Sequence, residues 1–93
     1  MPLRITFDCS EVDWSLVSST LQRVGMAYYE PGVHRQAFEN SHTAVFVYDG
    51  EQLVGFGRAI SDDAYQAAVY DMAVVPEYQG QGIGTTIMRQ ILN

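Results

Sequence analysis

Several residue types are scarce in this chain of 93 residues, and each scarcity narrows its function. The single cysteine, Cys9, excludes an internal disulfide, so we expect a small buried thiol in a cytoplasmic protein. There is no lysine, and five arginines with a net charge of −6 exclude the clustered cations of a nucleic-acid surface. No apolar run reaches membrane-spanning length, and the first residues lack the long apolar core of a signal peptide.

Metal ligands are scarce as well. The two histidines, His34 and His42, are eight positions apart, and no cysteine or carboxylate stands near them at a metal-ligand spacing. We therefore expect both histidines on the surface and no metal site.

What is present fits one folded domain over residues 1–93. Apolar residues make up 47% of the chain and charged residues 17%, as in a globular protein with a modest core that includes Trp14. In the first part, Ser10 and Asp13 resemble a capping box, and Gly25 is a helix stop. The elements predicted there are a strand Leu3–Phe7, a helix with its apolar stripe at Trp14, Val17, Leu21 and Val24, a loop Met26–Glu30, and a short helix from Pro31 to Phe38 or Asn40.

The middle of the chain predicts an antiparallel meander, because Asp49-Gly50 between two apolar runs is a strong hairpin signal. Nearly continuous apolar residues from Ala67 to Val75 indicate burial on both faces of the third strand. The predicted elements are strands Thr43–Tyr48, Leu53–Ile60 and Gln66–Val75, a turn at Ser61-Asp62-Asp63, and a last helix with its stripe at Ile83, Ile87, Met88, Ile91 and Leu92.

Between this meander and the last helix stands a glycine-rich loop. It follows Pro76 and carries Gly80, Gly82 and Gly84, so the N–H groups of residues 81–85 can converge on an anion at the positive end of a helix dipole. A turn that binds nothing needs one glycine rather than three. A Walker loop is excluded because no lysine is present. A dinucleotide fingerprint fits poorly, because its sixth position is Thr85 and the strands before it look antiparallel.

A third pattern, Gln79-x-x-Gly82-x-Gly84 after the strand and Pro76, resembles the GNAT superfamily of acyl-CoA-dependent N-acetyltransferases. The likeness is residue-specific from about Tyr70 to Met88 and otherwise rests on element order. It implies an α+β fold, with a mixed and mainly antiparallel sheet and helices on both faces. Asn93 comes only nine residues after Gly84, so we expect a truncated domain without the family's C-terminal strands and helix.

The resemblance also implies a function, the transfer of an acetyl group from acetyl-CoA to a primary amine by direct attack in a ternary complex, without a metal. An alternative is an incomplete acyl-CoA-binding or structural module that needs a partner. The exposed edge of strand 66–75 would favour a homodimer or a swapped assembly. The implied cofactor-binding residues are Met72, Ala73 and Val74 along the pantetheine arm, and Gln79, Gly80, Gln81, Gly82, Ile83, Gly84 and Thr85 at the pyrophosphate.

The implied catalytic residues are fewer. The family's base positions on the strand correspond to Ala68 and Tyr70; Tyr70 could hold a water or simply pack. Strict alternation puts Tyr70 on one face with Met72, and Asp71 on the other as a half-buried structural carboxylate. The family's thiol-protonating tyrosine would follow Asn93. Tyr28, Tyr29 and Glu30 could enclose a cationic amine or form an ordinary aromatic loop, and the acceptor is open among antibiotics, polyamines, amino acids, peptides and protein N-termini.

Overall fold

The computed structural model describes residues 3–61 and 67–92, which form one antiparallel sheet and three α-helices. The strands lie side by side in the order β1-β2-β3-β4, and each pairs antiparallel with its neighbour. The elements are β1 (Leu3–Thr6), α1 (Trp14–Arg23), α2 (Pro31–Glu39), β2 (Thr43–Asp49), β3 (Gln52–Ser61), β4 (Ala67–Val74), the short 3₁₀ turn η1 (Pro76–Tyr78) and α3 (Ile83–Leu92).

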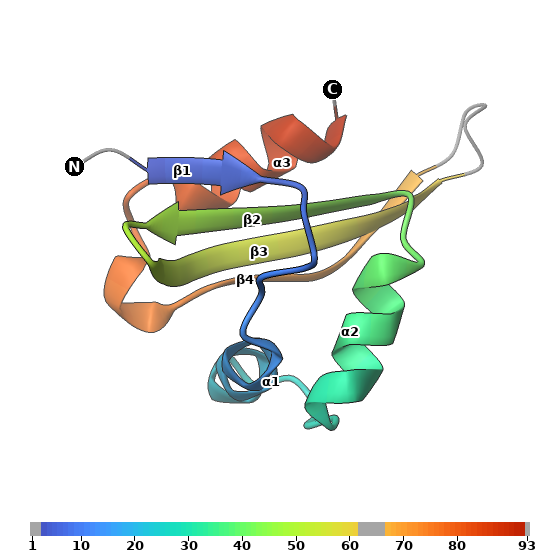
Figure 1. The fold of residues 1–93 in the computed structure, drawn as a ribbon. Helices are drawn as coiled ribbons and strands as arrows, with labels where there is room; N and C mark the ends of the chain where they lie inside the picture. The colour runs from blue at the N-terminus through green and yellow to red at the C-terminus, as the bar shows by residue number, and fades with distance from the viewer. Residues whose placement is uncertain (1–2, 62–66, 93) are drawn as a thin grey trace.

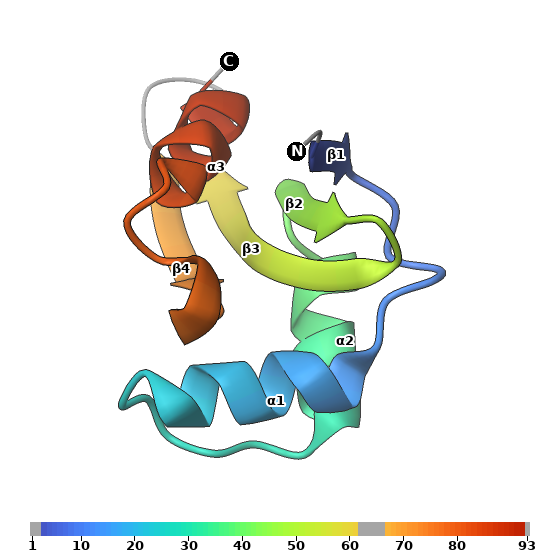
Figure 2. The ribbon, with the colours of Figure 1, turned by 90° about the vertical axis from the view of Figure 1, so that its left-hand side faces the viewer.

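The helices cover both faces of the sheet, as predicted. Helices α1 and α2 lie on one face and α3 on the other (Figure 1), and the view turned by 90° shows the curved sheet between these layers (Figure 2). Two apolar clusters fill the layers. Trp14 and Phe38 belong to the cluster under α1 and α2, whereas Ile83 and Ile87 pack on Val45, Val47 and Val54 under α3. The α+β prediction is confirmed, and Trp14 lies in the core as expected.

Helix α1 begins one turn later than the predicted capping box implies. Asp13 itself caps the helix, because its Oδ1 accepts hydrogen bonds from the Ser15 and Leu16 N–H groups at 3.1 and 3.3 Å. The capping role predicted for Ser10 is wrong, since its N–H bonds to the Asp8 carboxylate at 2.9 Å in a local turn.

The end of α1 follows the prediction. Gly25 has a φ of +94°, the Gly25 N–H donates to the Gln22 carbonyl, and the Met26 N–H donates to the Leu21 carbonyl at 3.0 Å. These two bonds make a Schellman motif, which needs a left-handed residue and therefore favours glycine. Val24, predicted to belong to the apolar stripe, is 37% exposed because the helix has already ended there.

The β2–β3 hairpin is confirmed with its loop shifted by one residue. Asp49 still pairs with Gln52, so the two loop residues are Gly50 and Glu51, and Gly50 has a φ of +61°. Glycine with positive φ at the first loop position is the signature of a type II′ hairpin turn. The predicted turn at Asp62 and Asp63, and the predicted strand start at Gln66, lie outside the described residues.

A bulge in β4 breaks the alternation that the sequence predicts. Phe56 pairs with Ala73 but Arg58 pairs with Tyr70, so Asp71 and Met72 together stand opposite the single residue Gly57. Asp71 takes a φ of +53° at this point.

The bulge redistributes the β4 side chains. Tyr70 lies on the α1/α2 side against Arg58, and Met72 lies on the α3 side, so their predicted sharing of one face is wrong. Both are also partly exposed, at 48% and 38%, so β4 is not buried on both faces. As the last strand in the order, β4 forms an edge of the sheet, and these side chains are only partly covered on both faces.

Two glycines in β3 let α3 lie close to the sheet. A Cβ at Gly55 would stand 2.9 Å from Ile83 Cγ2, and one at Gly57 would stand 3.0 Å from Ile87 Cγ2. Along α3, Ile83 and Ile87 are buried, whereas the predicted stripe residue Leu92 is 68% exposed. Among the described residues, no helix is long and apolar enough to cross a bilayer.

Candidate functional site

The candidate site begins where β4 ends. The Val75 N–H still donates to the Val54 carbonyl of β3 at 2.9 Å. Pro76, which has no N–H, then opens the turn η1, and the Tyr78 N–H returns to the Val75 carbonyl at 2.8 Å. The strand therefore stops at the proline, as predicted, and the chain turns away from β3 into the glycine loop.

Within the loop, two glycines are required by the backbone and one is not. Gly80 and Gly82 have φ values of +81° and +82°, a region that residues with a side chain rarely occupy. Gly84 lies in the first turn of α3 without a positive φ, and a Cβ there would meet only Val74 Cγ2, at 4.0 Å. The fold itself therefore does not demand glycine at position 84.

The loop presents free backbone donors. The Gly82 carbonyl accepts the first helical bond, from the Thr86 N–H at 3.1 Å. Within residues 3–61 and 67–92, the N–H groups of residues 81–85 donate to no backbone carbonyl. Gln81, Gly82 and Thr85 are exposed. These donors lie at the positive end of the α3 dipole, which is the arrangement that binds phosphate oxygens without a basic side chain.

The side chains of two predicted cofactor-binding residues contact other parts of the protein. The Gln79 amide Nε2 donates to the Val74 carbonyl at 3.1 Å and so ties the loop to the end of β4. The Ile83 side chain is 2% exposed and packs in the cluster under α3. The Ile83 side chain is therefore withdrawn from a ligand, whereas Gln79 is exposed and its bond to Val74 uses only Nε2.

The edge of β4 is the second part of the candidate site. Among the described strands, β4 pairs only with β3, so the other edge of Met72–Val74 carries no strand partner. Backbone groups of successive residues point to opposite edges. The Val75 N–H points toward β3, so the N–H and carbonyl groups of Val74 point to the outer edge. There the Gln79 side chain donates a hydrogen bond to the Val74 carbonyl. The edge thus runs directly into the glycine loop.

Beside this edge, on the α1/α2 side, lies a half-buried ion pair. Arg58 Nε donates to Asp71 Oδ2 at 2.7 Å, and Arg58 Nη1 donates to Ser41 Oγ at 3.2 Å. The two charged side chains are 16% and 19% exposed. The Arg58 guanidinium also lies 5.3 Å from the Tyr70 ring centroid. Asp71 is therefore the half-buried carboxylate that was expected, but the bulge puts it beside Tyr70 rather than on the opposite face.

His34 was expected on the surface, and the structure contradicts this. It is 4% exposed, and its Nε2 is buried without a hydrogen-bond partner in the described part of the chain. Burial lowers the pKa of His34 below 6.5; Asp71 opposes this shift and Arg58 adds to it. The sequence did carry a signal, since His34 and Phe38 stand four positions apart, on the same face of a helix.

The loop predicted to bind the acceptor, Met26–Glu30, is hydrogen-bonded near its end, whereas its aromatic side chains are exposed. Ser18 Oγ donates to the Tyr29 carbonyl at 2.9 Å, and the Tyr29 ring meets the His34 ring edge-on at 5.8 Å. Tyr28 and Tyr29 are 49% and 54% exposed, and Glu30 is exposed as well. The Tyr29–His34 contact thus links this loop to α2.

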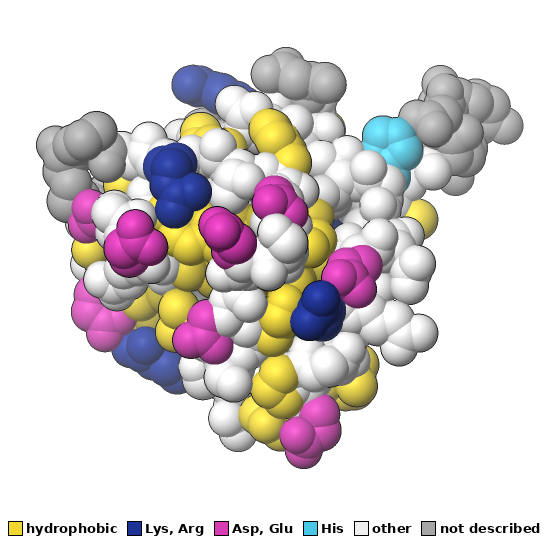
Figure 3. Space-filling view, in the orientation of Figure 1, with side chains coloured by type: hydrophobic (Ala, Val, Ile, Leu, Met, Phe, Trp, Pro, Cys, Tyr) yellow, Lys and Arg dark blue, Asp and Glu magenta, His cyan; other side chains and the backbone are white. Residues whose placement is uncertain are grey.

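The described residues offer neither a cluster of metal ligands nor an activated thiol. No group of three or more metal-ligating side chains occurs among the described residues. Cys9 is half-buried against the cluster under α1 and α2, and burial raises its pKa, which disfavours the thiolate. Basic side chains lie apart from one another on the face shown in Figure 3, where acidic ones are more prominent.

Comparison with curated proteins identifies relatives. A model of the acetyltransferase (GNAT) family matches residues 8–93. The uncharacterized N-acetyltransferase ycf52 of Gracilaria tenuistipitata var. liui is 33% identical over 84 residues, which cover 90% of this chain and 42% of the relative. A ycf52-like N-acetyltransferase of Prochlorococcus marinus is 33% identical over 94 residues, which cover 94% of this chain and 52% of the relative. The chain spans about half the length of these curated relatives.

Solved structures share the fold. A probable acetyltransferase from Staphylococcus aureus superposes with a TM-score of 0.85 at 27% identity, covering 98% of this chain and 67% of that one. A putative GNAT acetyltransferase from Xanthomonas campestris superposes with a TM-score of 0.84 at 26% identity, covering 99% of this chain and 66% of that one. Two Arabidopsis relatives are named as chloroplastic, so the cytoplasmic location stays a prediction. With the family match extending over residues 8–93, this chain belongs to the GNAT acetyltransferase family.

Proposed function

We propose that this chain binds acetyl-CoA and transfers its acetyl group to a primary amine by direct attack in a ternary complex. One observation carries the proposal. In the described chain, the N–H groups of residues 81–85 have no backbone acceptor, and they lie where the exposed loop meets the N-terminus of α3. Such donors suit the two phosphates of a pyrophosphate. The backbone-only design agrees with a chain that has no lysine.

The fit of the cofactor follows the two parts of the site. Backbone groups from Gln79 to Thr85 would hold the pyrophosphate, and the open edge of Met72–Val74 would accept the pantetheine arm as an added strand does. Gly84 supports this placement, because the fold has room for a Cβ there and a closely bound phosphate would not. When bound, acetyl-CoA supplies the acetyl group as an activated thioester.

The chain's own polar groups would act on the amine. Tyr70 stands 48% exposed on the α1/α2 side of β4, where its hydroxyl could hold the water that removes the amine proton. Tyr28, Tyr29 and Glu30 would enclose the cationic acceptor. The amine nitrogen forms its bond to the acetyl carbon, the carbon–sulfur bond breaks, and the thiolate sulfur takes up a proton.

A second candidate is an acyl-CoA-binding module that does not turn over alone. The open edge of β4 favours it, because this edge lies where the cofactor arm would need a second wall. Isothermal titration calorimetry with acetyl-CoA tests the shared premise: saturable binding supports both candidates, and no heat of binding overturns both. A thiol-release assay with a panel of amines then separates them, since turnover supports the transferase and binding without turnover supports the module.

A further inference from the structure

The glycine loop is held at its flanks: the Gln79 side chain ties it to the Val74 carbonyl at 3.1 Å, and two further anchors lie on either side. Gly80, Gln81 and Gly82 are exposed, and the space around the Cβ positions of Gly80 and Gly82 is empty to 4 Å. A loop of this kind takes whatever position its anchors impose, because no side-chain packing fixes it. The direction of its N–H groups therefore depends on what fixes residues 78, 79 and 83.

The downstream anchor is apolar. Ile83, the first residue of α3, is 2% exposed and packs with Val45, Val47 and Val54. This contact fixes the beginning of the helix against the sheet.

The upstream anchor is a polar bond across the fold. The Tyr78 hydroxyl donates to Asp49 Oδ2 at 2.6 Å, and the two residues are 29 positions apart. Asp49 ends β2 at the hairpin, so the bond ties η1 to the rigid part of the sheet. The Tyr78 side chain also packs against the cluster that holds Ile83. A short hydrogen bond to a carboxylate is stronger than one between neutral groups.

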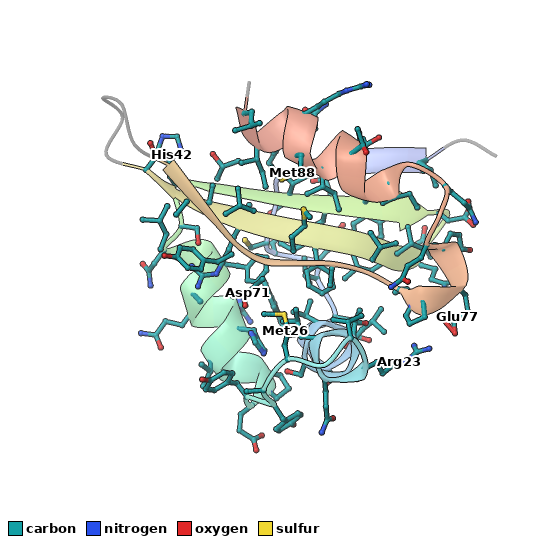
Figure 4. The ribbon with its side chains drawn as sticks, turned by 180° about the vertical axis from the view of Figure 1, so that it is seen from behind. Arg23, Met26, His42, Asp71, Glu77 and Met88 are labelled. Carbon is teal, nitrogen blue, oxygen red and sulfur yellow. The ribbon has the colours of Figure 1, made fainter. Side chains whose placement is uncertain are left out.

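A weaker contact holds the other side of the same turn. Arg23, at the end of α1, pairs with Glu77 of η1 at 2.8 Å; Figure 4 shows the two side chains at this end of the molecule. The side chains are 47% and 60% exposed, so water screens the pair and it adds little stability. It does place the Arg23 guanidinium beside Glu77, which precedes the glycine loop in the chain.

We propose that Tyr78 is a positioning residue for the anion site: its bond to Asp49 sets the height and direction from which the chain enters the glycine loop. The inference rests on the proposed function, since the anion is the coenzyme A pyrophosphate. Tyr78 does not touch the ligand and acts only through the backbone of residues 79–85. Breaking the bond widens the range of loop positions, and fewer of them direct the N–H groups at one point.

The test compares coenzyme A with pantetheine, which lacks the pyrophosphate and the 3′-phosphoadenosine attached to it. Tyr78→Phe keeps the ring packing and removes only the bond, and Tyr48→Phe removes a hydroxyl from a β2 tyrosine of the other apolar cluster as the matched control. Calorimetry measures the Kd of coenzyme A and of pantetheine for each protein. We expect Tyr78→Phe to weaken coenzyme A binding about tenfold and pantetheine binding by less than about twofold, because only coenzyme A uses the loop. Tyr48→Phe should leave both unchanged.

A ligand-free measurement keeps this test separate from the proposed function. Amide hydrogen exchange is followed at the hydrogen-bonded N–H groups that flank the loop, those of Tyr78, Gln79 and Thr86. It should speed up several-fold in Tyr78→Phe and Asp49→Ala, and less in Asp49→Asn, whose amide oxygen can still accept the bond. Unchanged exchange, or equal losses of affinity for both ligands, overturns the inference. If the intact chain binds no coenzyme A but Tyr78→Phe still frees the loop, the proposed function fails, and with it the role of Tyr78 at a pyrophosphate.

Discussion

Replacing Gly84 with alanine should raise stability and lower cofactor affinity at the same time. Gly84 is the second residue of α3, its φ is not positive, and a Cβ there would lie 4.0 Å from its nearest neighbour, Val74 Cγ2. Alanine loses less backbone entropy than glycine on entering a helix, so Gly84→Ala should stabilise the fold by about 0.5 kcal/mol. For a domain of this size, that gain raises Tm by roughly 2–4 °C.

The same methyl group should obstruct a phosphate. If the pyrophosphate lies against the N–H groups of residues 81–85, a Cβ at position 84 intrudes on it, and we expect the Kd of coenzyme A to rise about tenfold, or ~1.4 kcal/mol. Gly32→Ala is the matched control, because Gly32 is the second residue of α2, with nothing within 4 Å of its Cβ position. It should give the same gain in Tm with no change in affinity.

Differential scanning fluorimetry gives the Tm, and calorimetry gives the Kd of coenzyme A, for the wild type, Gly84→Ala and Gly32→Ala. Equal coenzyme A affinity in the wild type and Gly84→Ala would refute the idea that a ligand requires glycine at this position. A loss of both stability and affinity would show instead that position 84 is strained or crowded, contrary to the geometry.

Three further predictions concern the ion pair, His34 and the sheet edge. Asn tolerates the left-handed backbone at position 71, but Asp71→Asn leaves Arg58 half-buried beside a neutral group. The change should lower the free energy of unfolding, measured by urea titration, by about 2 kcal/mol. An unchanged free energy would contradict a stabilising ion pair. Burial lowers the pKa of His34, so on acidification the unfolded chain binds this proton before the folded chain does. The free energy of unfolding should therefore fall as the pH drops below 6.5, and His34→Gln should make this fall smaller. The same pH dependence in both proteins would refute the role of His34. Sedimentation should show self-association through the open edge of residues 67–74, whereas a monomer with a high Tm would exclude that expectation.

Structural features that depend on a few neighbouring residues could be predicted well. The hairpin at Asp49-Gly50, the helix stop at Gly25 and the strand end at Pro76 each depend on the backbone preference of one residue, and all are found near their predicted positions. The glycine loop was recognisable for the same reason, since two of its glycines have positive φ. Local chemistry determines such features almost alone.

The details that failed depend on partners far along the chain. The β4 bulge arises where Asp71 and Met72 pair with a single residue of β3, Gly57, so it belongs to a register rather than to the strand sequence. The burial of His34 depends on which face of α2 packs against the sheet. The anchoring of Tyr78 by Asp49 also joins residues 29 positions apart, and composition gives no sign of it.

The two glycines of β3 couple the packing of the core to the position of the glycine loop. A side chain at Gly55 would push on Ile83, the residue with which α3 begins, and one at Gly57 would push on Ile87 a turn later. The helix would lift from the sheet and carry the donors of its first turn with it. If the loop holds the proposed cofactor, a Gly55→Ala change in the hydrophobic interior would weaken binding from a position outside the site itself.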